Sequence, residues 1–149
     1  MEDQRISVAK RHIKLTLSNG TQINGETFLQ LHGEHLTGLQ RVEEILNGED
    51  IFLPVRHSGK VELISLEQIV SVEVAANEEF DPLLALGEEH QITVEPVAGD
   101  VLDVHIFVNL PGGCNRVKDF LNQQKRFLLL LRDDRILYIA RNKILRIQD

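Results

Sequence analysis

The stretch RVEEILNGEDIF, residues 41–52, is echoed 75 positions later by RVKDFLNQQKRF, residues 116–127. The residues identical in both copies are, in the first, Arg41, Val42, Leu46, Asn47 and Phe52, and in the second, Arg116, Val117, Leu121, Asn122 and Phe127. Self-similarity of this extent within 149 residues predicts that one structural unit is present twice.

The echo continues on both sides of this block. Residues 13–31 match residues 92–110 at an offset of 79, and residues 52–74 match residues 127–149 at an offset of 75. Gly20 then falls on Gly99 and Phe28 on Phe107. We therefore expect a first unit at 1–75 with its repeat core at 12–75, a linker at 76–89, and a second unit at 90–149.

Each unit has the pattern of short strands with one short helix. Ile13, Leu15 and Leu17 alternate with polar residues up to a turn at Asn19-Gly20, and alternation resumes after it, which is typical of a β-hairpin. Residues 39–46 instead carry apolar residues at helical spacing. Three more strands follow, with matching turns at 58–59 and 133–134. The pattern predicts a mainly β protein made of two small five-stranded barrels, each with a short helix between strands two and three.

The helix is expected to end at an asparagine in both units. Asn47-Gly48 offers residues that tolerate the left-handed backbone conformation, and Asn122 keeps this position in the second unit. We therefore expect a positive φ angle at both asparagines.

The hairpin LTLSNGTQINGETF resembles the opening motif of Sm-like proteins, with Gly20, Gly25 and Phe28 at the matching positions. This resemblance, shared in its turn pattern by SH3-like barrels, implies a small β-barrel. In Sm-like proteins an Asp and an Asn after the phenylalanine contact RNA, but here Phe28 is followed by LQLHGEH. The doubled RVxxxLN…F pattern also looks like an uncharacterised bacterial family of small β domains.

The repeated polar residues have two interpretations. Arg41 and Arg116 could pair with the acidic residue three positions on, and Asn47 and Asn122 could end the helices, so that all four are structural. Alternatively, these four residues line two copies of one ligand site. Both interpretations predict retention in the two units, so the repeat alone does not separate them.

No motif of an enzyme or cofactor-binding protein is present. His32 and His35 flank Glu34 in a Gly-bounded loop that the second unit lacks, which makes a poor metal site. Cys114 in PGGCN has no histidine at a recognisable spacing. We expect no enzymatic activity, no cofactor and no metal.

Composition indicates a globular chain in the cytoplasm. Hydrophobic residues make up 42% and charged residues 26%, and a single cysteine rules out an internal disulfide. The longest apolar run, 127–131, is far shorter than the roughly 20 residues of a membrane helix. The net charge of −7 works against non-specific binding to nucleic acid.

The linker combines acidic and large apolar residues. Phe80, Leu83, Leu84 and Leu86 predict that it packs on the barrels instead of forming a flexible spacer. The adjacent Glu78-Glu79 pair is expected at the surface.

Charge is segregated along the chain. Residues 116–149 contain nine Lys or Arg, whereas residues 76–115 contain none and eight Asp or Glu. The basic set either pairs internally across the junction of the units or meets a protein partner with an acidic face. The candidate protein-binding residues are Arg132, Arg135, Arg141, Lys143 and Arg146.

The leading hypothesis is a non-enzymatic interaction or scaffold module that binds another protein, or itself, through a strand edge or barrel face. An Sm-like single-stranded RNA binder is the alternative, and a sensor of a small ligand held between the two lobes is a second one. Salt-dependent retardation of single-stranded RNA on a gel separates the first two, because phosphate neutralisation is obligatory for RNA binding.

The charge pattern generates a prediction. The double change Arg141→Glu with Arg146→Glu should leave the melting temperature nearly unchanged and remove a protein partner from a pull-down. Unfolding of the variant, with capture falling only in proportion, would place these arginines in the internal junction.

Overall fold

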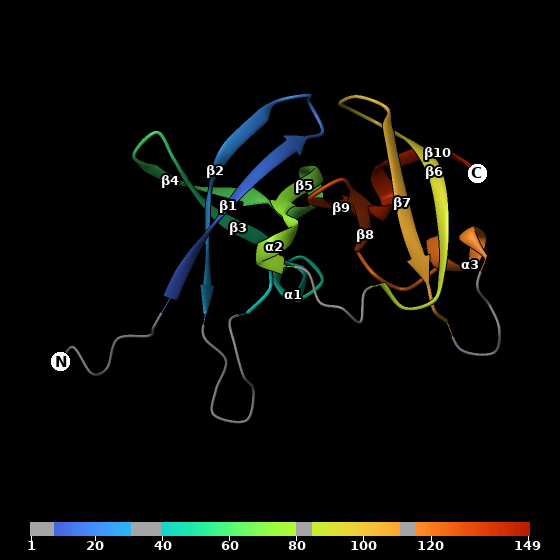
Figure 1. Ribbon diagram of the computed structural model, residues 1–149. Coiled ribbons are helices and arrows are strands. Elements are labelled where there is room, and N and C mark those ends of the chain that lie inside the picture. The colour runs from blue at the N-terminus through green and yellow to red at the C-terminus, as the bar shows by residue number, and fades with distance from the viewer. Residues whose placement is uncertain (1–7, 31–39, 80–84, 111–115) are drawn as a thin grey trace.

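A computed structural model describes residues 8–30, 40–79, 85–110 and 116–149 (Figure 1). The protein is mainly β, with ten antiparallel strands: β1 Val8–Leu17, β2 Gln22–Gln30, β3 Phe52–His57, β4 Lys60–Ser65, β5 Ile69–Ala75, β6 Glu88–Pro96, β7 Leu102–Val108, β8 Phe127–Arg132, β9 Arg135–Ala140 and β10 Ile144–Gln148. The described residues also include three short helices: α1 Val42–Leu46, α2 Ala76–Glu79 and α3 Val117–Leu121. Single 3₁₀ turns, η2 Leu66–Gln68 and η5 Arg141–Lys143, precede β5 and β10.

The strands join into one open sheet. Their order is β10-β6-β7-β8-β9-β5-β1-β2-β3-β4, so the two halves of the chain are connected by the pairing of β5 with β9. In Figure 1 the first five strands lie on the left, the last five on the right, and β5 and β9 meet between them. Two separately closed barrels were expected. The described strands instead form a single sheet that is not closed.

Strand neighbours and registers correspond between the halves. The first half runs β5-β1-β2-β3-β4 and the second β10-β6-β7-β8-β9. Leu15 faces Ile23, and Val94 faces Leu102, 79 positions on. The register also shifts at matching points, beside Leu17 where β1 meets β5 and beside Ile144 where β6 meets β10.

Local geometry follows the turn residues of the sequence. Gly20 and Gly99 adopt φ angles of 88° and 90° after β1 and β6. At the predicted turns after β3 and β8, Ser58 and Asp133 both have a φ of 53°, the left-handed values that two-residue hairpins require. Gly25 has a different role, since a Cβ there would lie 2.6 Å from the carbonyl oxygen of Arg56.

α1 and α3 lie where helices were expected, whereas α2 lies in the predicted linker and was not expected as a helix. The prediction for the ends of α1 and α3 is wrong. Asn47 and Asn122 have φ angles of −99° and −94°, and the backbone N–H of each donates to the preceding turn. Asn47 uses its side chain elsewhere, because its Oδ1 accepts a hydrogen bond from the backbone N–H of Phe127, 2.8 Å away. In the second half Asn122 Nδ2 donates to the carbonyl of Lys118 at 2.8 Å. Thr37, which with Gln40 could form a capping box before α1, lies outside the described residues.

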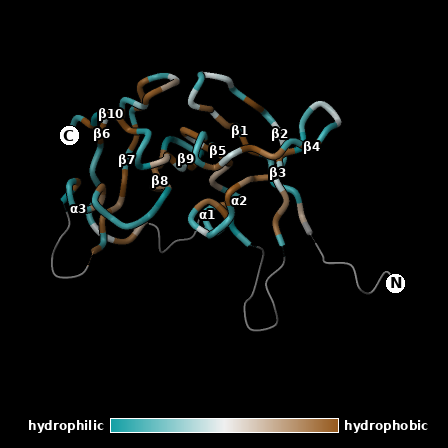
Figure 2. The backbone as a smooth tube through the Cα atoms, turned by 180° about the vertical axis from the view of Figure 1, so that it is seen from behind, coloured by the Kyte–Doolittle hydropathy of each residue, from teal (hydrophilic) through white to brown (hydrophobic). Residues whose placement is uncertain are grey.

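The apolar side chains form two cores that share β9. Ile136, Tyr138 and Ala140 point into the core of the first half, whereas Leu137 and Ile139 point into the core of the second. Figure 2 shows apolar backbone segments gathered along the inner strands of both halves. Because its two faces lie in different cores, β9 ties the halves into one folded body.

Burial differs sharply between residues that occupy the same place in the two halves. Phe127 begins β8 and is fully buried in the first core, whereas Phe52 begins β3 and is 52% exposed. Tyr138 is likewise buried on β9, whereas its counterpart Leu63 on β4 is 66% exposed. β9 is covered by β5, and no described strand covers β4 in the same way.

This contrast gives a matched test of stability. Phe127→Ala should lower the free energy of unfolding by about 3–5 kcal/mol, because it opens a cavity in a closed core. Phe52→Ala should lower it by less than about 1 kcal/mol, because the ring is half solvated already. Urea denaturation at micromolar protein concentration measures both, and equal losses would contradict the burial pattern.

Candidate functional site

The two ends of the sheet carry the candidate interaction surface. β4 and β10 are its terminal strands, and among the described strands each pairs on one side alone. Unpaired backbone N–H and C=O groups along such an edge can accept a further strand. β4 and β10 are therefore the two ends of the described sheet at which a further strand can be added.

Exposed apolar side chains gather at the β4 end. Eight large apolar residues are exposed among the described residues, and half of them belong to β3, β4 or the residue before β3: Ile51, Phe52, Val61 and Leu63. We call these four residues the β4 patch. Phe52, Val61 and Leu63 lie on one face of the hairpin, as the β3–β4 register places them. Contiguous apolar surface beside an open strand edge is typical of a protein-binding site.

The hairpin that carries the β4 patch has a well-defined geometry. His57 pairs with Lys60 across the two-residue turn, and His57 Nε2 also contacts the carboxylate of Glu62. Arg56 stacks over the ring of Phe28, 5.6 Å from its centroid, which ties β3 to β2. The β4 patch therefore projects from a supported hairpin, visible at the left of Figure 1.

The β10 end is less apolar. Leu145 is exposed there, and Arg146 forms an ion pair with Glu95 on the neighbouring strand β6. A groove of about 400 Å³ runs beside β10 and is lined by Thr93, Glu95, Val101, Arg146, Ile147 and Gln148. A second groove of about 640 Å³ lies on the same half, bordered by β6, β7 and Gln148. This end of the sheet is hollowed, whereas the β4 hairpin projects.

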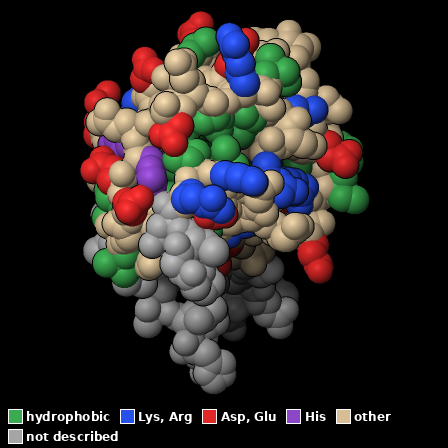
Figure 3. All heavy atoms as spheres, turned by 90° about the vertical axis from the view of Figure 1, so that its right-hand side faces the viewer, with side chains coloured by type: hydrophobic (Ala, Val, Ile, Leu, Met, Phe, Trp, Pro, Cys, Tyr) green, Lys and Arg blue, Asp and Glu red, His purple; other side chains and the backbone are tan. Residues whose placement is uncertain are grey.

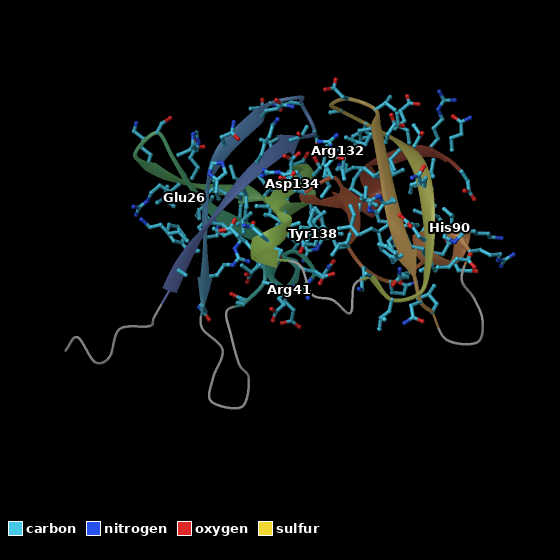
Figure 4. The ribbon with its side chains drawn as sticks, in the orientation of Figure 1. Glu26, Arg41, His90, Arg132, Asp134 and Tyr138 are labelled. Carbon is cyan, nitrogen blue, oxygen red and sulfur yellow. The ribbon has the colours of Figure 1, made fainter. Side chains whose placement is uncertain are left out.

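The edge of β9 corresponds to the open edge of β4, but it is paired with β5 inside the chain. Val72 faces Tyr138, and Glu73 faces Leu137. Glu73 also pairs with Arg132 at 3.2 Å and with Arg135 at 2.9 Å. Figure 4 shows Arg132 and Asp134 close to the place where the halves meet.

Loop contacts reinforce this junction. Besides the hydrogen bond from Phe127 to Asn47, the guanidinium of Arg126 donates to the carbonyls of Gly48 and Asp50, at 2.5 and 3.3 Å. Lys125 lies 3.9 Å from the carboxylate of Glu43. The segment that leads into β8 is therefore fixed to the segment after α1.

A buried polar cluster lies beneath the junction. Glu79, at the end of α2, is 2% exposed. Its carboxylate accepts hydrogen bonds from the Tyr138 hydroxyl at 2.6 Å and from the backbone N–H of Val42 at 3.1 Å, and it forms an ion pair with Arg11. Glu79 was predicted to lie at the surface, which is wrong. It joins β1, α1 and β9, and so fixes the linker to both halves.

Ionisation is perturbed around this cluster. Burial, together with the carboxylate of Glu79, raises the pKa of Tyr138 well above its usual range. Burial lowers the pKa of Arg41, but the neighbouring Glu43, Tyr138 and Glu79 outweigh it and leave the pKa raised. Figure 4 shows Arg41 below Tyr138 on the same side of the molecule. The tyrosine is thus a neutral hydrogen-bond donor at any physiological pH.

The repeated arginines differ in their surroundings. Arg41 is partly buried near the cluster and pairs with Glu43 at 3.0 Å, while its backbone N–H donates to Glu44 at 2.7 Å. The side chain of Arg116 is largely exposed and pairs with Asp119 at 3.0 Å, which lowers the pKa of that carboxyl. The expected pairing three positions on is therefore present for the guanidinium of Arg116, whereas the guanidinium of Arg41 pairs two positions on.

The five predicted protein-binding residues are distributed over β8, β9, η5 and β10. Arg132 and Arg135 lie in the junction with Glu73. Arg141 donates to the carbonyl of Gln123 at 2.6 Å, and the backbone carbonyl of Lys143 accepts from Val97 at 2.9 Å. Arg146 lies on the β10 edge. Figure 3, the view onto the second half, shows basic side chains in a row beside apolar ones, with acidic side chains around them.

Sequence reasoning missed the β4 patch and Glu79. Comparison of the repeats contains the signal for the first. KVELIS on β4 alternates charged and apolar residues, whereas the matching RILYIA on β9 is nearly all apolar and must be covered on both faces. For Glu79 the signal is weaker: Tyr138 lies within an apolar strand, and a buried hydroxyl usually has a partner.

In 8–30, 40–79, 85–110 and 116–149, no three His, Cys, Asp or Glu side chains are grouped to hold a metal ion. His32, His35 and Cys114, together with Phe80, Leu83 and Leu84 of the linker, lie outside these ranges. None of the described helices is long and apolar enough to span a bilayer.

Comparison with known proteins found no matching family model, no matching curated protein and no matching solved structure.

The buried cluster gives a direct prediction. Glu79→Gln should lower the free energy of unfolding by about 3–5 kcal/mol, because the Arg11 charge then lies buried without its counter-ion. Glu78→Gln, one residue away and exposed, is the matched control and should change it by less than about 0.5 kcal/mol. Urea denaturation at pH 7 measures both, and a stability of Glu79→Gln within error of Glu78→Gln would contradict this role.

Proposed function

We propose that this chain is a non-enzymatic protein-interaction module, built from two copies of one five-stranded unit, that binds a protein by strand addition at β4. The observation that carries the proposal is the β4 patch, an apolar surface beside an open strand edge. Backbone pairing supplies affinity in this mode of binding, and the side chains beside it supply specificity.

Matching pairings support the two-copy interpretation. Glu26 faces Arg56 where β2 meets β3, and His105 faces Leu131 where β7 meets β8. These pairs are related by the offsets of 79 and 75 that the sequence contains. Phe52 faces Ser65, and its counterpart Phe127 faces Ala140. The two units, 1–75 and 90–149, would then differ chiefly in what covers their fourth strand.

The size of the β4 patch suits a specific contact. Each of its side chains is half exposed or more, so burying them should contribute about 1 kcal/mol each. Hydrogen bonds from a strand laid along β4 would add about 0.5–1.5 kcal/mol each. Together these contributions can offset the cost of association for a partner with one extended segment.

A site-specific photocrosslinker tests this proposal. Benzoylphenylalanine in place of Leu63 should, on irradiation in cells, form a covalent adduct with protein. The same label in place of Asn24, which is exposed on β2, is the matched control. Mass spectrometry of the adducts identifies what β4 contacts.

The outcomes separate the alternatives. Protein adducts formed from position 63 and not from position 24 support the proposal. A nuclease-sensitive adduct would favour the RNA-binding alternative, in which salt-dependent retardation of single-stranded RNA should accompany it. The absence of any adduct at position 63 would contradict binding at β4.

A further inference from the structure

β5 pairs with β9 inside the chain, and the two terminal strands of the sheet, β10 and β4, can form the same kind of pairing between two molecules. By position in the two halves, β5 corresponds to β10 and β9 corresponds to β4. The two strands that meet inside the chain therefore have counterparts that are the two free ends. We infer that β4 of one molecule pairs with β10 of a second copy, as β9 pairs with β5, so that molecules assemble head to tail. This inference rests on the proposed function and names its partner.

Burial at the junction matches exposure at the ends. Ile136 and Tyr138 of β9 are completely buried, and their counterparts Val61 and Leu63 of β4 are 50% and 66% exposed. On the other strand Val70 is buried, and its counterpart Leu145 is exposed. Phe127 at the start of β8 is buried, and its counterpart Phe52 at the start of β3 is exposed. The exposed residues Val61 and Leu63 of β4 are thus the counterparts of buried residues of β9, the strand that pairs with β5.

The internal register fixes the register between molecules. Val72 faces Tyr138 and Glu73 faces Leu137 inside the chain. Moving each residue to its counterpart places Ile147 opposite Leu63 and Gln148 opposite Glu62 of the next molecule. Leu63 would then approach the second core, against which Ile144 and Ile147 already pack.

Polar groups at the ends can reproduce those of the junction. Asn47 Oδ1 accepts the backbone N–H of Phe127, so Asn122 Oδ1 is placed to accept the N–H of Phe52 from the next copy. Asn122 Nδ2 donates to the Lys118 carbonyl at 2.8 Å, and this bond does not use the side-chain oxygen. This pairing thus explains why the asparagine occurs twice: Asn47 binds the start of β8 in the same chain, and Asn122 binds the start of β3 in the next molecule.

The charged residues of the β5–β9 junction are not repeated at the ends of the sheet. Glu73 holds Arg132 and Arg135 inside the chain, and the corresponding residues at the ends are Gln148, His57 and Lys60. A neutral amide facing Lys60 replaces the ion pairs. Apolar contact and backbone pairing therefore dominate the contact between molecules, and added salt should weaken it little.

Space is available beside β10 for the incoming strand. The groove next to it measures about 400 Å³, whereas the corresponding groove beside β5 measures about 90 Å³. The smaller groove is lined by Ser71 and Glu73, by Arg132 and Leu137 from β8 and β9, and also by five residues between Pro96 and Leu102 at the turn between β6 and β7. Arg132 and Leu137 correspond to His57 and Glu62, which lie on the hairpin that bears the β4 patch.

Head-to-tail contacts use two different surfaces, so each molecule offers one β4 and one β10. Repetition of such a heterologous contact closes into a ring if the rotation permits, and otherwise extends as a filament. A symmetric pair formed by two β4 edges would stop at a dimer. The length of the covalent products after crosslinking distinguishes these arrangements.

Paired cysteines test the register. In a Cys114→Ser background, the double variant Leu63→Cys with Ile147→Cys should give, on mild oxidation of the purified protein, a ladder of three or more linked chains. Directly opposed residues bring Cβ atoms about 4.5–5.5 Å apart, close enough for a disulfide. Leu63→Cys with Gln148→Cys is the matched control, because residue 148 projects from the other face, and it should link at least tenfold less.

Light scattering of the uncrosslinked protein gives a second measure. Wild-type protein at about 100 µM should show a mass well above the 16.9 kDa of one chain, falling on dilution. Val61→Lys with Leu63→Lys should remain at the mass of one chain, with an unchanged circular dichroism spectrum that shows it is folded.

Two results would overturn the inference. One is wild-type protein that stays at the mass of one chain at 100 µM together with no ladder. The other is oxidation that stops at dimers linked through residue 63 alone. If either occurs while position 63 captures a different protein in cells, the proposed function stands and its partner is not a second copy.

Discussion

β9 is covered on both faces, and the rest of the fold depends on that constraint. A strand buried in this way needs apolar residues at consecutive positions, and RILYIA provides them. Its even-numbered residues belong to the core of the first half, and Leu137 and Ile139 belong to the core of the second. Each core therefore includes β9, and the pairing with β5 turns two similar groups of strands into one sheet.

Polar groups specify how this shared strand is seated. Tyr138 is the member of β9 that carries a hydroxyl, and Glu79 accepts its hydrogen bond together with one from α1 and an ion pair from β1. A carboxylate that must satisfy three elements at once allows little variation in their arrangement. Glu73 adds two arginine contacts at the solvent side of the same junction. Apolar burial thus supplies most of the driving force, and these two carboxylates fix the relative position of the halves.

Much of the local structure could be predicted from the sequence. Alternation around Asn19-Gly20 gave the first hairpin, helical spacing around Val42 gave α1, and the turns at 58–59 and 133–134 are present. These features depend on neighbours along the chain. The position of Glu79 could not be obtained in this way, because its partners Arg11 and Tyr138 come from distant strands. Asn47 was predicted to end the helix with a positive φ angle. Its side chain instead accepts a hydrogen bond from the backbone N–H of Phe127, 80 positions away.

The closure of each half was the main error, and its cause is physical. Five alternating strands suggest a barrel when each strand is assumed to find its partners within its own unit. The apolar excess of β9 over β4 shows that these two strands have different surroundings, and this asymmetry becomes visible when the two halves of the sequence are compared residue by residue. Similar sequences in a repeat indicate similar backbones, but the differences between the copies indicate which surfaces face each other.

The long separation between β5 and β9 also has a consequence for synthesis of the chain. β5 ends at Ala75 and β9 begins at Arg135, so the ribosome makes β5 well before the strand that covers it. During that interval the first half has an open apolar edge, the kind of transiently exposed surface that makes incomplete chains prone to aggregate. The order in which residues emerge therefore leaves this edge unpaired until β9 is made, and rapid completion of the second half shortens the exposure.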